Sequence, residues 1–150
     1  MPTKQERKAL RKQRRAERKK LRKERRAKFN EIVDVATKAK ITIDLDKKEP
    51  KFVDAFNQVW PVLKPGLEYA ELVRVTGPGA DKVLRSVIIL GERVSTGTAS
   101  GDEQSAFIHT LDTVWEPVKA VLGILVTFTD DKTDKIIDKI VEIGDWITDS

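Results

Sequence analysis

The chain divides into two parts of opposite charge. The first 28 of its 150 residues hold 15 Lys and Arg against 3 Glu, a net charge of +12. The other 122 residues hold 14 basic and 21 acidic residues, a net charge of −7. The basic segment has almost nothing apolar to bury and repels itself, so it cannot form a compact domain. Its natural partner is a polyanion, and nucleic acid is the first candidate.

Residues 1–38 are predicted to form a basic helical arm. Between Pro2 and Lys38 there is no Gly or Pro, and strong helix formers dominate up to Lys28. A helix of this length would extend about 50 Å. Its like charges, three and four residues apart, favour fraying in isolation and helix formation against an anionic surface. At its end, the helical spacing of Phe29, Ile32 and Ala36, together with Val33, predicts a docking segment.

Residues 39–50 are predicted to be an extended linker. Ile41, Ile43 and Leu45 alternate with polar residues, which fits either a short strand or an extended segment whose apolar side chains enter the core. The chain offers no obvious second strand, so we favour the linker. Pro50 then suits the first turn of the next helix.

Residues 51–150 contain an internal repeat. Residues 52, 59, 60, 64 and 67 recur 55 positions later, and residues 72, 73, 76, 81, 82 and 91 recur 53 positions later. The first set is Phe52, Val59, Trp60, Lys64 and Leu67, repeated as Phe107, Val114, Trp115, Lys119 and Leu122. Eleven identities with one two-residue deletion indicate a duplicated unit.

Each copy of the unit, 51–97 and 98–150, is predicted to be a helical hairpin. Pro61 and Pro117 predict a kink or a break in the first helix of each copy. The second helices, near 79–95 and 132–148, each carry an apolar face on which Gly91 or Gly144 would allow close helix approach. Two such hairpins bury their faces by packing together, so the fold class is all-α, with 51–150 as one four-helix bundle-like domain. The polar segment 95–104 is predicted to be a mobile connector.

The candidate nucleic-acid-binding residues all lie in the arm. They are Lys4, Arg7, Lys8, Arg11, Lys12, Arg14, Arg15, Arg18, Lys19, Arg22, Lys23, Arg25 and Arg26. The Arg fork suits phosphate oxygens. No aromatic residue precedes Phe29, which argues against stacking on unpaired bases and for contact with the phosphate backbone without sequence readout. The alternatives are a merely solvated tail, acidic surfaces of neighbouring subunits, and an anionic membrane, for which the arm lacks an apolar face.

The rest of the sequence predicts no catalytic, metal or cofactor site. The chain has no Cys and one His, His109, which excludes thiolate sites and argues against a multi-histidine site or a triad. Residues 130–134 (Asp-Asp-Lys-Thr-Asp) resemble the DDxxD motif of isoprenoid synthases, which implies Mg²⁺-diphosphate binding. The chain lacks their second acidic motif, so we interpret the segment as a helix N-terminus. Trp60 and Trp115 are predicted to pack in the core. Trp146, which has no Trp counterpart, is predicted to be partly exposed and to contact another subunit.

These patterns predict a non-enzymatic, nucleic-acid-associated structural or assembly protein, with a phage or other virion component as one form of it. The alternative is an oligomeric assembly component whose arm docks onto acidic surfaces of its neighbours. A homo-oligomer or larger assembly is expected in both cases. The N-terminus lacks the apolar stretch of a signal peptide, and no apolar run reaches the roughly 20 residues of a membrane span, so we expect an intracellular or virion location. The sequence leaves DNA and RNA equally open.

Overall fold

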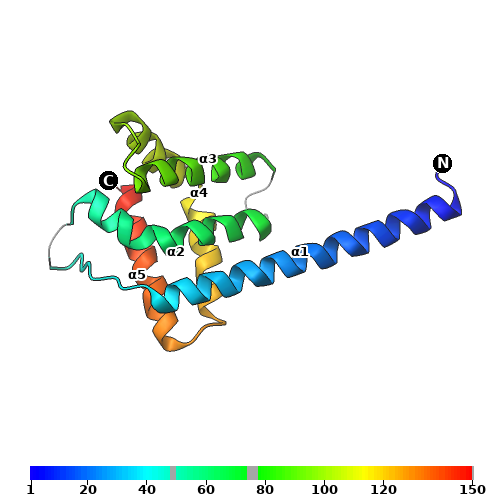
Figure 1. Ribbon diagram of the computed structural model, residues 1–150, viewed down its shortest axis with the longest axis horizontal. Helices are drawn as coiled ribbons and strands as arrows, with labels where there is room; N and C mark the ends of the chain where they lie inside the picture. Colours follow the sequence, from blue (N-terminus) through cyan, green and yellow to red (C-terminus); the bar gives the residue numbers. More distant parts are fainter. Residues whose placement is uncertain (48–49, 74–77, 150) are drawn as a thin grey trace.

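The computed structural model describes residues 1–47, 50–73 and 78–149, and in these ranges it contains helices and no strand. The all-α prediction is confirmed. The helices are α1 (Lys4–Lys38), α2 (Phe52–Val73), α3 (Pro78–Ser95), α4 (Gly101–Val126) and α5 (Asp131–Asp149) (Figure 1). None of the helices in the described part of the chain is long and apolar enough to cross a membrane.

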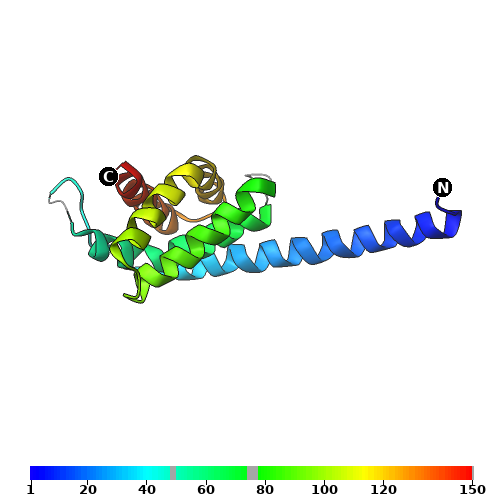
Figure 2. The ribbon, with the colours of Figure 1, turned by 90° about the horizontal axis from the view of Figure 1, so that it is seen from above.

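Helix α2 is the centre of the bundle. It packs against α1, α3, α4 and α5, while α3 packs on α4 and α4 on α5. Helix α1 lies along α2 and contacts α5 near its C-terminal end, and its N-terminal half extends far beyond the other helices (Figures 1 and 2). In the segment predicted to dock, Ile32 and Ala36 are fully buried, and Phe29 and Val33 are half-buried. The C-terminal part of α1 therefore belongs to the core.

Two helices begin at capping boxes. Thr3 and Glu6 exchange side-chain-to-backbone hydrogen bonds of 3.1 and 3.2 Å at the start of α1. Ser100 and Glu103 do the same at the start of α4, with bonds of 3.1 and 3.3 Å. The predicted connector 95–104 was therefore too long, because the Ser100 capping box starts α4 at Gly101 and fixes part of that segment as helix.

The prolines do not break the helices. Helix α2 runs through Pro61 and Pro65, and α4 runs through Pro117, so the predicted break is wrong. A proline inside a helix costs about 3 kcal/mol, mainly through a lost hydrogen bond and a steric clash. The surrounding turns of α2 offset this cost by packing, since Val62, Leu63 and Pro65 are all buried. Tertiary burial thus overrides the local penalty.

Residues 40–44, which precede α2 in no helix or strand, are held by a side chain of α2, and residues 45–47 form a turn. Gln58 Oε1 accepts hydrogen bonds from the backbone N–H groups of Thr42 and Ile43 at 2.9 and 3.3 Å. Gln58 Nε2 donates a hydrogen bond to the Thr42 hydroxyl at 2.8 Å. Ile41, Ile43 and Leu45 are partly buried against the core. Gln58 thus supplies the hydrogen bonds that a second strand would otherwise have supplied.

The helix pairs α2–α3 and α4–α5 each bury a tryptophan that makes similar polar contacts. The Trp60 indole N–H donates to Glu92 at 3.2 Å, and Lys64 lies 2.6 Å from the same carboxylate oxygen. Between α4 and α5, the Trp115 indole N–H donates to Asp145 at 2.7 Å, and Lys119 donates to the same oxygen at 3.1 Å.

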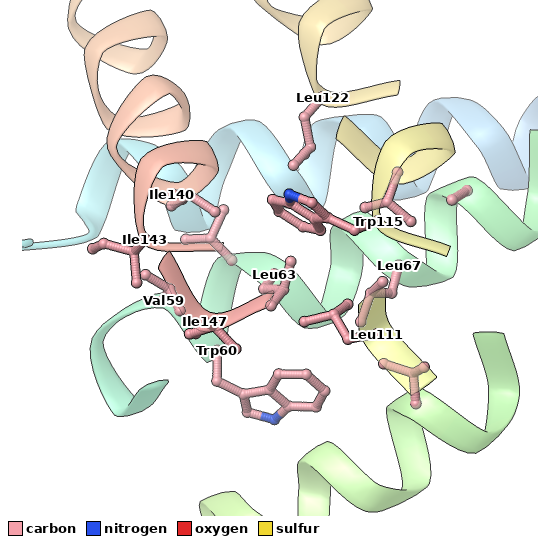
Figure 3. Packing of buried hydrophobic residues seen from close by; sticks show 14 of the residues in the cluster. Val59, Trp60, Leu63, Leu67, Leu111, Trp115, Leu122, Ile140, Ile143 and Ile147 are labelled. Atoms are coloured by element: carbon pink, nitrogen blue, oxygen red, sulfur yellow. The ribbon is translucent and has the colours of Figure 1, made fainter. Parts of the chain in front are cut away.

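Trp60 and Trp115 are 4% and 3% exposed, so the expectation that they pack in the core is met. Figure 3 shows both rings among buried aliphatic side chains. The indole N–H of each ring nevertheless reaches a carboxylate, which satisfies the one polar group of a buried tryptophan.

Glu92 gives the first hairpin a predicted pH dependence. Hydrogen bonds from Lys64 and then from Trp60 hold the pKa of Glu92 below its ordinary value of 4.5. A depressed folded-state pKa means that this stabilisation is complete above pH 4.5 and is lost as pH falls through the folded-state value. We expect Glu92→Gln to lower the free energy of unfolding at neutral pH by less than about 1 kcal/mol, because the ion pair is solvent-accessible.

The check for Glu92→Gln is urea denaturation between pH 3 and pH 7. The difference from the unsubstituted protein should shrink as pH falls below 4.5, the ordinary pKa of the group. A difference for Glu92→Gln that stays constant over the whole range would contradict the assignment.

Candidate nucleic-acid interface

The N-terminal part of α1 stands free of the packed helices α2–α5, which we call the body. Every residue from Met1 to Lys20 is exposed, and α1 projects away from the other helices in two perpendicular views (Figures 1 and 2). Contact with the body starts near Leu21, which is half-buried. The free arm is therefore residues 1–20, whereas the sequence predicts docking from Phe29 onward.

Arg25 and Lys28 fasten α1 to the body. The Arg25 Nε donates to the carbonyl oxygen of Leu72 at 3.1 Å. The Lys28 ammonium lies 2.8 Å from Glu31 and 3.4 Å from Glu68. Burial lowers the pKa of Lys28, but the hydrogen bond that Lys28 donates to Glu31 and the charge of Glu68 raise it by more, so the net shift is upward. Of the candidate binding residues, Arg25 is therefore partly engaged within the protein, while the other twelve are exposed.

Most of the basic residues of α1 lie on one side of the helix. Successive helical residues are rotated by about 100°, so each position has a fixed direction around the axis. All thirteen candidate residues fall within one half of the circumference, which we call the basic face, and Gln5 is the only other residue of 4–28 there. Lys20 and Lys28, which were not among the candidates, fall on the opposite half. That half also contains Glu6, Ala9, Leu10, Gln13, Ala16, Glu17, Leu21, Glu24 and Ala27.

Apart from Arg25, which is bonded to the rest of the protein, the basic face is a continuous and accessible surface. From Lys4 to Arg26 it extends about 33 Å at 1.5 Å per residue. All three Glu of this segment lie on the opposite half, so no acidic side chain interrupts the basic face. The sequence interpretation counted these charges but did not assign them directions. A helical wheel of residues 4–28 would have revealed the face.

An acidic cavity lies where α1 joins the body. It has a volume of about 600 Å³ and lies between α1, α2 and α3. Its charged lining consists of Glu24, Glu31, Glu68, Glu71 and Asp81 with Lys28 and Arg85. Arg85 pairs with Glu71 at 3.0 Å, so the cavity keeps an excess of carboxylates. The charge of this surface suits a basic partner.

The segment 130–134 has a structural role in this fold. The Asp130 carboxylate accepts the backbone N–H of Thr133 at 2.8 Å, just before α5 begins at Asp131. Hydrogen bonds from Thr133 lower the pKa of Asp130. Asp134 accepts a hydrogen bond from the Thr129 hydroxyl. Within the described ranges, no group of three His, Cys, Asp or Glu is placed to hold a metal ion.

The two other singled-out residues lie on different helices, and Trp146 packs against the hydrophobic core. His109 is exposed on α4, and Trp146 is half-buried on α5. Comparison with protein families, with curated proteins and with solved structures found no match to the chain. The functional argument therefore depends on the geometry of α1 and the body.

Proposed function

We propose that this chain is a non-enzymatic, nucleic-acid-associated structural or assembly protein whose basic face binds the phosphate backbone without reading sequence. The observation that carries the proposal is the composition of the free arm, where half of an exposed helix is basic over its whole length. Binding of such a surface to phosphates releases the counterions of the nucleic acid, which favours the complex. A virion or an intracellular nucleoprotein is the setting that we propose.

The width of the basic face favours a duplex over a single strand. A narrow stripe of charge is enough to follow one row of phosphates, whereas a face covering half the circumference can contact anions on both flanks at once. The major groove of B-DNA, about 12 Å wide, admits an α-helix between two phosphate walls. The major groove of duplex RNA is too deep and narrow for this. The absence of aromatic residues before Phe29 also removes the means of stacking on unpaired bases.

We also propose that the body arose by duplication of one helical hairpin, α2–α3 and α4–α5. The matching Trp–carboxylate–Lys contacts in the two hairpins support this proposal independently of the overall alignment. In this proposal the body is a structural platform for protein contacts, and the arm is the nucleic-acid-binding element.

The test is equilibrium binding of the full chain to a random-sequence DNA duplex over a series of salt concentrations, beside a chain lacking residues 1–20. The docked part of α1 is retained in the truncated chain, so its body should keep its fold. We expect the logarithm of the binding constant of the full chain to fall with the logarithm of salt with a slope of about −6, as for six to seven neutralised phosphates. The truncated chain should lose this binding. Equal binding by both chains would refute the proposal.

The acidic cavity favours a second candidate function, an oligomeric assembly component whose arm docks onto a neighbouring subunit. Its lining carboxylates provide complementary charge for a basic helix. In that case, deleting residues 1–20 would dissolve the oligomer while nuclease treatment left it unchanged. The nucleic-acid function would be favoured if nuclease treatment dissociated the oligomer. Deleting residues 1–20 should then not affect any self-association that remains after nuclease treatment.

A further inference from the structure

A basic cavity lies at the end of α1 that is farthest from the arm. It has a volume of about 730 Å³ and lies between residues 39–42 and the first half of α5. Figure 1 shows the chain leaving α1 at this end, remote from the N-terminus. The charged lining consists of Lys40, Lys132, Lys135 and Lys139 with Asp131. We call this cavity the lysine groove.

The lysines of the groove are not neutralised by the described part of the chain. Beyond residue 28, five described basic residues form ion pairs: Lys38, Lys64, Arg85, Arg93 and Lys119. Seven others form none with any described residue: Lys40, Lys47, Lys51, Lys82, Lys132, Lys135 and Lys139. Four of these seven line the lysine groove. Unpaired positive charge is therefore concentrated there, which suits an anionic partner.

The rest of the groove lining is largely apolar and includes free backbone groups. Ala39, Ile41 and Ile136 line the groove and are half-buried. Half-buried and exposed residues alternate from Ala39 to Asp44, as they do along a strand. The backbone N–H groups of Lys40 and Ile41 form no hydrogen bond with any described residue. Such a segment can accept an extended peptide as an added strand.

These features favour an acidic peptide over a nucleic acid. Side chains on one face of an extended peptide are about 6.7 Å apart. Lys135 and Lys139 are about 6 Å apart along α5, so alternate carboxylates of a peptide can meet both lysines. The side chains between those carboxylates are then free to contact the apolar lining. A phosphate backbone has neither apolar side chains for this lining nor amide groups for the backbone of Lys40 and Ile41.

We propose that the lysine groove binds an extended segment of a partner protein in which acidic and large apolar residues alternate. The segment pairs with residues 39–42 as a strand, its carboxylates meet Lys135 and Lys139, and its apolar side chains cover Ile41 and Ile136. This inference rests on the part of the proposed function that assigns protein contacts to the body. The groove and the arm are at opposite ends of α1, so one chain can hold a nucleic acid and a protein at once.

The test is fluorescence anisotropy of a short labelled peptide of alternating Glu and Val, titrated with the full chain in the presence of excess random-sequence duplex. The duplex occupies the arm, which would otherwise attract any anion. A peptide of alternating Glu and Ser has the same charge and is the control for binding by charge alone. We expect the Glu–Val peptide to bind about tenfold more tightly, because it alone has apolar side chains for the groove.

Two double variants test the position of the site. Lys135→Gln with Lys139→Gln should weaken binding of the Glu–Val peptide about three- to tenfold, since each exposed ion pair contributes little. Lys51→Gln with Lys82→Gln removes the same charge outside the groove and should leave the peptide affinity unchanged. All four lysines are exposed, so both variants should fold. Both should bind the duplex as the unsubstituted chain does, because the arm is intact.

The inference is overturned if the two peptides bind equally, or if the two double variants lose peptide affinity equally. A loss of duplex affinity confined to Lys135→Gln with Lys139→Gln would also overturn it, and would assign the groove to phosphates. Failure of the unsubstituted chain to bind the duplex would contradict the proposed function alone. The comparison of the two peptides would still decide the inference, because their charges are equal.

Discussion

Replacing Gly91 or Gly144 by alanine is expected to destabilise the helical body by about 1 to 3 kcal/mol, the usual cost of overpacking a core. A Cβ atom at Gly91 would lie 2.1 Å from the nearest ring carbon of Trp60, and one at Gly144 would lie 2.2 Å from Trp115. Both rings are buried and rigid, so neither can move aside without shifting its helix. The expected loss outweighs the gain of about 1 kcal/mol that alanine brings to a helix interior.

The measurement is the free energy of unfolding by urea, at protein concentrations low enough to keep the chain monomeric. Gly123→Ala is the matched control, because nothing lies within 4 Å of the added Cβ, and it should stabilise the protein slightly. Combining Gly91→Ala with Trp60→Phe should cost less than the sum of the two single changes, since the smaller ring leaves room for the methyl group. Strict additivity, or a stabilising Gly91→Ala, would show that the ring does not fill the space over Gly91.

Gly91 and Gly144 show which contacts the sequence repeat predicts and which it does not. The repeat placed Gly91 and Gly144 on an apolar face and suggested that they allow close approach of two helices. The structure shows what approaches them, which is a tryptophan ring from the partner helix of the same hairpin. The alignment paired Trp60 with Trp115 and Gly91 with Gly144 separately, but it could not show that each Trp covers a Gly. That contact depends on the register of two helices in space, which no local pattern encodes.

The differences between prediction and structure have local physical causes. The break expected at Pro61 does not occur, because burial of its neighbours in α2 offsets the lost hydrogen bond. The start of α4 was placed too late, although the Ser100–Glu103 capping box was readable. The attachment of the linker through Gln58 had no sequence signal, because a glutamine side chain can pair with any backbone segment that reaches it.

The basic arm is the part of the chain for which the sequence carries the most functional information. Composition shows the charge of the arm, whereas the direction of that charge follows only from the angular positions of its residues around the helix. The sequence predicts docking from Phe29, and the structure shows that contact begins near Leu21. The structure divides the basic residues into an exposed face and two fastening residues, Arg25 and Lys28. Only the exposed face is free to meet a large anionic partner. The proposal for nucleic-acid binding therefore depends on where the charges point as well as on their number.

Exchanging three arginines of the basic face with three residues of the opposite half is expected to weaken binding to duplex DNA without changing the charge of the chain. The exchanged pairs are Ala9 with Arg11, Gln13 with Arg15, and Ala16 with Arg18. The composition, net charge and helix propensity of the arm stay the same, because each pair only trades places. About three phosphate contacts should be lost, which makes the salt slope shallower by about 2.7 and weakens binding by about ten- to a hundredfold near physiological salt.

The measurement that tests this account most directly is the salt-dependent affinity of the full chain and of its face-exchanged variant for the same random-sequence duplex. Circular dichroism of both proteins bound to the duplex confirms that the arm is equally helical in each. The account predicts tight binding by the full chain, a shallower salt dependence and a lower affinity for the variant, and weaker binding of the full chain to single-stranded DNA. Equal affinities and equal slopes for the two proteins would contradict it, because binding would then depend on net charge alone and not on the basic face.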